Sequence, residues 1–244
     1  MKIENALYLL PVNISDAPLR ECLPAINLEF ADAIRYFIVE NIRTARRFLK
    51  RCNPAVNISD LVFYELNGHT PEDDISSFLE PLRCGEPMAL MSEAGCPAVA
   101  DPGAVIVRVA QSEGLRVVPL VGPSSLLMSL MASGLNGQRF AFQGYLPVDN
   151  ADREKKIRDL ESQSGRDDMT QIFIETPYRN VRMMESLLKI LRGDTLLCVA
   201  TGVTDPVYEK IVTKSVAQWR RENYNIEKVP TVFLFYNAGK SRLR

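Results

Sequence analysis

The segment with the clearest chemical potential is a run of small and turn-forming residues at positions 92–103. It follows an apolar stretch typical of a buried strand and precedes a helical pattern, and open parallel sheets bind ligands at such strand ends. Gly95 can adopt backbone angles that other residues avoid, while Pro97 and Pro102 restrict the backbone around it. The segment therefore predicts a preformed surface that a ligand can approach closely. The alternative is an ordinary connector in which Asp101 only caps the following helix.

The elements that position this segment follow an alternating pattern through the first half of the chain. Short apolar runs alternate with helical patterns, which is typical of parallel strands joined by crossover helices. We predict strands over residues 6–10, 34–39, 61–64, 88–91 and 115–120. Helices are predicted over 75–82, 101–114 and 124–133. The last of these is apolar nearly all round, so we expect it to be buried.

A second domain is predicted where the composition turns to Gly, Pro, Asp and Asn around residues 144–150. A charged helical stretch follows, so we place one domain at 1–146 and the other at 147–244. Later strands are expected over 171–175, 195–200, 207–212 and 231–236, with a helix over 181–191. Because long helices do not separate all of these strands, the second sheet should be mixed. The predicted fold class is α/β with two domains, the first sheet mainly parallel.

The charge balance restricts how this chain could bind a polyanion. Its 29 basic and 30 acidic residues leave a formal charge of -1, so any nucleic-acid surface must be local. One basic stretch lies on a predicted helix opposite an apolar face, and phosphate contacts there would add salt-dependent affinity. Its members are Arg43, Arg46, Arg47, Lys50 and Arg51. The alternative, which we favour from the sequence, is a solvated helix face.

The cysteines and the single histidine predict no metal site. The five cysteines lie far apart, without the paired spacing of a zinc site or a redox motif. We therefore expect reduced cysteines and a cytoplasmic location. The opening apolar run ends at Pro11 and is too short for a membrane span, so no membrane partner is expected.

Further motifs follow the central segment in a fixed order. Asp-Pro-Gly at 101–103 is followed by Val-Val-Pro-Leu-Val-Gly-Pro-Ser-Ser at 117–125 and by Phe-Gln-Gly-Tyr-Leu-Pro at 142–147. The series resembles the ribosomal RNA small-subunit methyltransferase I family, a branch of the tetrapyrrole (corrin and porphyrin) methylases. Members carry Ser-Asp-Ala-Gly-Thr-Pro, Asp-Pro-Gly, Pro-x-x-Gly-Pro and Gly-Phe-Leu-Pro in this order. Weaker matches at 40–43, 64–67 and 173–179 extend the resemblance over most of the chain.

The resemblance implies a class III methyltransferase fold that binds S-adenosylmethionine in a cleft between two domains and releases S-adenosylhomocysteine. It also implies a homodimer whose partner is ribosomal RNA or the small ribosomal subunit. Carried over by matching position, the expected cofactor contacts are Pro11, Ser92, Glu93, Ala94, Gly95, Ser124, Ser125 and Thr176. Asp101 is a further candidate because it belongs to the same loop.

The chemistry of such an enzyme makes few demands on catalytic residues. A sulfonium methyl donor is already electrophilic, so the protein must chiefly align donor and acceptor at about 3–3.5 Å and exclude water. A ribose hydroxyl acceptor would benefit from a nearby proton acceptor, for which Glu175 and Glu93 are candidates. Arg179 is a candidate for orienting the acceptor or binding its phosphate. The alternative for each is a capping or ion-paired residue.

The sequence departs from the family pattern in two places. Residues 11–15 lack the glycine of the family's Pro-Ile-Gly-Asn, and residues 201–205 lack both basic residues of its Arg-Glu-Leu-Thr-Lys. Three functions remain, in this order. The first is a ribosomal RNA ribose 2′-O-methyltransferase, which predicts a basic rim. The second is a small-molecule, tetrapyrrole-type methyltransferase with an enclosed apolar pocket, and the third is a non-catalytic cofactor-binding homologue.

Overall fold

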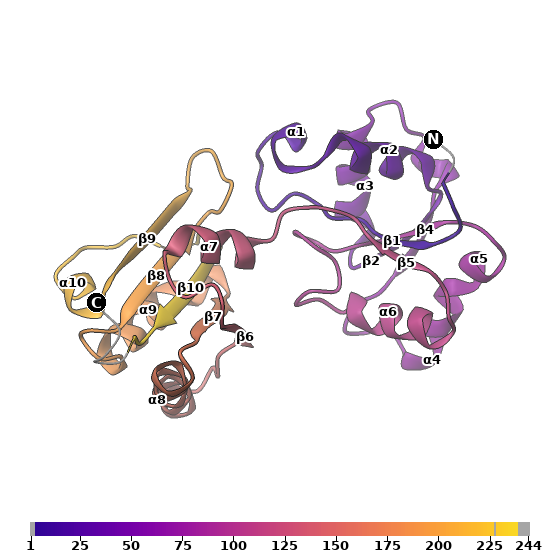
Figure 1. Ribbon diagram of the computed structural model, residues 1–244. Helices are drawn as coiled ribbons and strands as arrows, with labels where there is room; N and C mark the ends of the chain where they lie inside the picture. Colours follow the sequence, from indigo (N-terminus) through magenta and orange to yellow (C-terminus); the bar gives the residue numbers. More distant parts are fainter. Residues whose placement is uncertain (1–2, 227, 239–244) are drawn as a thin grey trace. The chain divides into compact units, whose positions relative to one another are not determined.

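The computed structural model describes residues 3–226 and 228–238, with only the backbone of Glu72. The chain divides into two compact units, Met1–Ser124 and Ser125–Arg244 (Figure 1). The boundary expected after Leu146 therefore falls inside the second unit. The reason is that β6 (Phe140–Tyr145), which precedes the expected boundary, pairs with a strand of the second sheet.

The first unit is built on a parallel five-stranded sheet in the order β3-β2-β4-β1-β5. Its strands are β1 (Leu7–Leu9), β2 (Tyr36–Val39), β3 (Val62–Glu65), β4 (Met88–Met91) and β5 (Val117–Pro119). The five strands predicted for the first half of the chain are thus confirmed, with slightly different ends. All four residues of β4 are buried, as expected for a strand covered on both faces.

Helices cover both faces of this sheet, as Figure 1 shows. One layer holds α1 (Leu19–Cys22), α2 (Ala25–Ala33) and α3 (Ile42–Cys52), which is followed by a 3-10 turn at Ile58–Asp60. The other holds α4 (Glu72–Ile75), η2 (Ser76–Leu79), α5 (Glu80–Arg83) and α6 (Gly103–Ser112). The continuous helix predicted over 75–82 is wrong. Pro81 at the start of α5 has no N–H to donate and its ring crowds the preceding turn, so the chain forms short helical pieces instead.

Alternate strand residues feed two separate hydrophobic cores. Phe37 and Met91 pack with Phe48 and Leu49 of α3 on one face. On the other face, Leu90 packs with side chains from the second helical layer, including α6. Because consecutive strand residues point to opposite faces, both cores fix the same register of the sheet.

The second unit contains a mixed sheet in the order β6-β7-β10-β8-β9. Its other strands are β7 (Thr170–Glu175), β8 (Leu196–Thr201), β9 (Lys210–Ser215) and β10 (Thr231–Tyr236). Only β6 and β7 are parallel, so the predicted mixed sheet is confirmed. Strand β9 starts later than predicted because Asp205 accepts hydrogen bonds from the backbone N–H groups of Val207 (2.9 Å) and Tyr208 (3.0 Å), which fold that segment into a turn.

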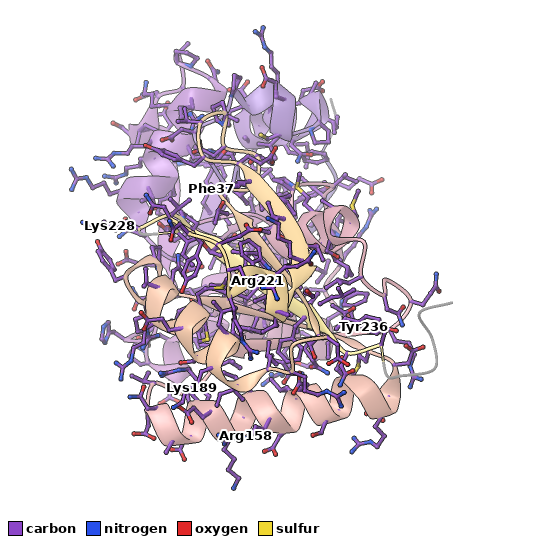
Figure 2. The ribbon with its side chains drawn as sticks, turned by 90° about the vertical axis from the view of Figure 1, so that its left-hand side faces the viewer. Phe37, Arg158, Lys189, Arg221, Lys228 and Tyr236 are labelled. Atoms are coloured by element: carbon purple, nitrogen blue, oxygen red, sulfur yellow. The ribbon has the colours of Figure 1, made fainter. Side chains whose placement is uncertain are left out.

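Helices α8 (Asn150–Asp167), α9 (Asn180–Ile190) and α10 (Val216–Trp219) supply one core of the second unit. A 3-10 turn, η3 (Pro177–Arg179), precedes α9. Figure 2 shows Arg158 on α8 and Lys189 on α9, and both side chains contact the carboxylate of Glu154, at 3.3 and 2.6 Å. These surface pairs add little stability individually, so the packed core must hold the two helices on the sheet.

Helix α7 (Ser125–Ser133) packs against β8, β9 and β10. The expectation that it is buried on all sides is wrong. Its buried side chains are Ser129, Leu130 and Ser133, whereas the side chain of Met131 is 83% exposed. The backbone carbonyl of Ser133 accepts a hydrogen bond from the Thr213 hydroxyl at 2.7 Å, so small polar residues form the contact with the sheet.

The loops after β1 and β5 approach so closely that one position requires glycine. A Cβ atom built on Gly122 would lie 2.2 Å from Cβ of Pro11 and 2.5 Å from its Cγ. Pro11 cannot rotate away because its ring belongs to the backbone. The two loops that leave the carboxyl edge of the sheet are therefore locked together at this point.

We expect Gly122→Ala to destabilise the protein by about 1–3 kcal/mol or more, because the added methyl group overpacks a contact that cannot relax by a rotamer change. Chemical denaturation monitored by circular dichroism would measure the loss. Gly137→Ala is the matched control, since a Cβ at Gly137 meets no atom within 4 Å, and it should change stability by no more than about 0.5 kcal/mol. Equal stability of the two variants would contradict the packing argument.

Candidate functional site

The strand order of the first unit defines where a ligand would bind. β2 and β4 are neighbours, yet the chain leaves β2 toward β3 at one edge and leaves β4 toward β5 at the other. Strands whose connections diverge in this way open a crevice at their carboxyl ends, where α/β sheets bind ligands. A cavity of about 260 Å³ lies there, between α3, the loop after β1 and the end of β4. Its lining residues are Val12, Asn13, Asp16, Thr44, Ala45, Arg47, Phe48, Arg51, Met91, Ser92 and Glu93.

The loop after β4 is fastened to the loop after β1 by two backbone hydrogen bonds. The N–H of Val12 donates to the carbonyl of Gly95 at 3.0 Å, and the N–H of Gly95 donates back at 3.2 Å. Gly95 has a φ of +76°, and a Cβ there would meet the carbonyl oxygen of Pro123 at 3.1 Å. The hydroxyl of Ser92 donates to the carbonyl of Ala94 at 3.3 Å. The predicted glycine bend is thus present and tightly packed.

The same loop continues through two alanines in an unfavourable conformation. Ala98 and Ala100 have φ values of 65° and 61°, in the left-handed region that residues with a side chain avoid. The carboxylate of Asp101 accepts hydrogen bonds from the N–H groups of Ala98 (2.9 Å) and Gly103 (2.7 Å) and so holds this shape. Asp101 therefore accepts the first N–H of α6, although the N-cap position itself is Pro102. Such strained backbone concentrates at functional sites, which favours a binding loop over an ordinary connector.

Three carboxylates lie near one another beside this loop, on Glu40, Glu93 and Asp101. Burial raises the pKa of Glu40, the negative charge of Asp101 raises it further, and the charge of Glu93 adds to both, while a hydrogen bond from the backbone of Glu93 opposes them. Burial likewise raises the pKa of Asp101, against its two backbone hydrogen bonds. The Glu93 carboxylate accepts a hydrogen bond from the Thr44 hydroxyl at 2.6 Å, which links the loop to α3.

Helix α3 supplies the cationic wall of the cavity. Its Ala45, Phe48 and Leu49 are buried, which confirms the predicted apolar face. Arg47 and Arg51 line the cavity together with Thr44, Ala45 and Phe48 of the same helix. Strand β2 leads into this helix, so the fold delivers its basic face to the carboxyl edge of the sheet.

The loops after β1 and β5 complete this edge. Residues 11–15 turn without glycine, because the side-chain amide of Asn13 donates to the carbonyl of Ser15 and no residue of this stretch has a positive φ. The buried amide of Asn27 on α2 donates to the carbonyl of Val121 at 2.8 Å. Cys96 stands where the family pattern has threonine, and its thiol contacts the carbonyl of Pro123 at 3.3 Å. Burial raises the pKa of the Cys96 thiol, so it packs as a neutral group.

The remaining predicted site residues lie in the second unit. The buried carboxylate of Glu175 uses one oxygen to accept hydrogen bonds from the N–H of Thr176 (2.7 Å) and from Nη2 of Arg179 (2.6 Å). Glu175 and Arg179 therefore form an ion pair, which was the alternative to a catalytic role for these residues. The pair fixes the turn that carries Thr176. Ser125 begins α7.

The structure thus brings part of the predicted set together within one unit. Pro11, Ser92, Glu93, Ala94, Gly95, Asp101 and Ser124 belong to the first unit, whereas Ser125, Glu175, Thr176 and Arg179 belong to the second. Sequence reasoning missed Thr44, which lines the cavity and contacts Glu93. It noted Arg47 and Arg51 only as part of a basic stretch. Their spacing of four residues, which places them on one side of a helix, is the signal that could have singled them out.

Neither a metal site nor a membrane-spanning helix is found in the part of the chain that the structure describes. Within residues 3–226 and 228–238, no three His, Cys, Asp or Glu side chains are grouped so that they could hold a metal ion. No described helix is both long enough and apolar enough to cross a bilayer.

Solved structures similar to this chain are methyltransferases of tetrapyrrole biosynthesis. The methyltransferase CobJ matches with a TM-score of 0.58 and 19% identity over 88% of this chain and 89% of its own. The cobalt precorrin-4 methyltransferase CbiF matches with a TM-score of 0.59 and 15% identity over 95% of each chain. The uroporphyrin-III C-methyltransferase of Thermus thermophilus in complex with S-adenosyl homocysteine gives 0.56 and 16%, over 96% of this chain and 98% of its own. The two-domain α/β fold of the tetrapyrrole methylases is thereby established.

Curated relatives at higher identity narrow this class to one family. The ribosomal RNA small subunit methyltransferase I of Bacillus subtilis is 32% identical over 220 residues, which are 89% of this chain and 70% of the relative. That of Haemophilus influenzae is 31% identical over 73% of this chain, and that of Vibrio cholerae is 29% identical over 97%. The matches cover 62% and 80% of those two relatives. No model of a known protein family matches. The chain belongs to the ribosomal RNA small subunit methyltransferase I family.

The carboxylates beside the loop generate a pH-dependent prediction. Because the folded pKa of Glu40 lies above its ordinary value of 4.5, the folded state loses stability as pH rises from that value through the raised pKa. Glu40→Gln removes this penalty, so its free energy of unfolding relative to the wild type should increase with pH over this window and then stay constant. Urea unfolding between about pH 4 and pH 8 measures the difference. Glu86→Gln, at an exposed glutamate, is the control. A Glu40→Gln difference that is flat with pH would contradict the raised pKa of the partly buried Glu40 carboxylate.

Proposed function

We propose that this protein is an S-adenosylmethionine-dependent methyltransferase whose methyl acceptor is a ribose 2′-hydroxyl of ribosomal RNA. Family membership supports the activity and the acceptor. The single structural observation that carries the proposal is the rigid loop 92–103, with its glycine bend and its two left-handed alanines, beside a cavity at the diverging strands β2 and β4. A preformed loop at this position meets the main demand of methyl transfer, which is alignment of donor and acceptor.

The residues of the first unit fit an adenosyl ligand. The donor would supply an electrophilic sulfonium methyl group. Gly95 packs against Pro123 and Ile14, where no side chain fits, and this packing fixes the backbone of the loop that we propose to contact the ligand. Pro11 and Ser124 belong to the neighbouring loops at the same edge of the sheet. Asp101 stabilises loop 92–103 by accepting a hydrogen bond from its backbone. Ser125 and Thr176 stay predicted contacts from the second unit.

Proton acceptance from a ribose hydroxyl has two candidates. Glu93 is exposed on the loop and lines the cavity, where its carboxylate already accepts the Thr44 hydroxyl. Glu175, with Arg179, stays a predicted catalytic pair, although one of its oxygens is engaged by donors of its own turn. A carboxylate at hydrogen-bonding distance from the acceptor hydroxyl would take its proton as the oxygen attacks the methyl carbon.

The cavity wall favours RNA over the small-molecule alternative. A tetrapyrrole-type acceptor predicts an enclosed apolar pocket, whereas charged side chains of both signs line this cavity, including Arg47, Arg51, Asp16 and Glu93. We also propose a cytoplasmic location and a homodimer, as the resemblance implies. Size-exclusion chromatography with light scattering would test the dimer.

The activity has a direct test. Purified protein incubated with methyl-labelled donor should transfer label to the RNA fraction of cells that lack the enzyme, and not to their protein or small-molecule fractions. Label in the small-molecule fraction would favour the tetrapyrrole-type alternative. Calorimetry that detects uptake of neither S-adenosylmethionine nor S-adenosylhomocysteine would refute the enzymatic proposal.

Substitution in the loop tests where the donor binds. Gly95→Ala should weaken donor binding about tenfold, because a Cβ at this φ is strained by about 1–2 kcal/mol and crowds Pro123 and Ile14. The loop of the variant relaxes to relieve this strain, and binding must restore the original shape. Isothermal titration calorimetry measures the affinity. Gly137→Ala is again the control, and it should bind the donor as the wild type does. Unchanged affinity in Gly95→Ala would place the donor elsewhere.

A further inference from the structure

We propose that Arg47 and Arg51 form a phosphodiester-binding site that holds the ribose-phosphate backbone of the RNA acceptor in the cavity beside the loop. The inference rests on the proposed function and assigns the acceptor to a particular wall of the first unit. The sequence alone favoured a solvated helix face for this basic stretch, and the proposal replaces that interpretation.

The position of the two arginines is the first support. They lie four residues apart on α3, so their side chains leave the same side of the helix about 5–6 Å apart at Cβ. Both line the cavity, whose other wall includes Ser92 and Glu93 of the loop proposed to hold the donor. A phosphate bound by the arginines would therefore leave the attached sugar beside that loop.

The second support is that these arginines keep donors for a ligand. Arg51 donates from Nη2 to the carbonyl of Ala17 at 3.2 Å, which orients its guanidinium. In the described part of the chain, Arg47 makes no hydrogen bond or ion pair, and neither arginine lies within ion-pair distance of Asp16 or Glu93. A guanidinium carries five N–H donors in a fork that matches phosphate oxygens.

Two other cations of α3, Arg46 and Lys50, make contacts within the protein. The Arg46 guanidinium lies over the Phe63 ring, 5.3 Å from its centroid. The Lys50 ammonium donates to the carbonyls of Pro54 (3.1 Å) and Val56 (2.6 Å). Both side chains are used within the protein and neither lines the cavity. Four of the five cations of α3 therefore form a structural pair and a cavity-facing pair, and the fifth, Arg43, does not line the cavity.

The size of the cavity restricts the ligand. At about 260 Å³ it lies slightly below the range of about 300–1,000 Å³ usual for drug-sized ligands. This volume is sufficient for one ribose-phosphate unit. Phosphate contacts position a nucleic acid without reading its bases, so this site would set the distance between ribose and donor and leave sequence choice to other surfaces.

Arg47→Ala tests the site, with Arg46→Ala as a matched control that removes the same charge one residue away. For methyl transfer to RNA, we expect Arg47→Ala to raise KM about tenfold while kcat changes by less than about twofold, because a positioning contact is lost and the chemistry is not. The slope of log affinity for RNA against log salt should also fall by about 0.7–1. Arg47→Lys should recover part of the affinity and all of the slope, since the charge is restored.

Three results would overturn the site. They are an unchanged KM and salt slope in Arg47→Ala, an equal loss in Arg46→Ala, or weaker binding of S-adenosylmethionine in Arg47→Ala by calorimetry. Fluorescence anisotropy with a labelled fragment of small-subunit ribosomal RNA measures the slopes without turnover. If the wild-type protein methylates no RNA, the proposed function fails, yet the anisotropy series still decides whether Arg47 binds RNA phosphate. Unfolding midpoints of all variants verify that each is folded.

Discussion

The two hydrogen bonds between Val12 and Gly95 are the constraint on which the site depends. They join the loops after β1 and β4, which are neighbouring strands, just beyond the edge of the sheet. Because Gly95 lies with its α-carbon against the carbonyl of Pro123, the loop after β5 is fixed by the same contact. The close contact between Pro11 and Gly122 also joins the loops after β1 and β5. Three loops are thus joined at this edge of the sheet, and a cavity lies between them and α3.

The proposed site offers a way for a nearly neutral chain to bind the polyanionic acceptor that we propose. The formal charge of -1 provides no long-range attraction, so affinity must come from a few placed cations. α3 follows β2, and the divergence of β2 and β4 directs its basic side toward the cavity. In the proposed site, the two arginines on one wall of the cavity therefore take the place of an extended basic surface.

The sequence predicted the strands and the loop well, because apolar runs and turn residues report local structure directly. β6 was missed because Gly144, with a φ of +66°, and the bulge after Phe142 interrupt its alternating pattern. The burial of α7 was mispredicted because its hydrophobic composition hides which side meets the sheet, and Met131 points outward. The cavity could not be predicted at all, since it exists only because β2 and β4, distant in sequence, are neighbours.

The strain in the loop connects the fold to the reaction. A left-handed alanine costs about 1–2 kcal/mol, so the conformations of Ala98 and Ala100 persist only because Asp101 and the surrounding packing hold them. A loop that must relax into shape when a ligand arrives would spend binding energy on ordering itself. One that is already ordered can use that energy to align a methyl group with its acceptor, and alignment is the main requirement of this chemistry. In the proposed function, the carboxylate of Asp101 would contribute to transfer by fixing the backbone of this loop.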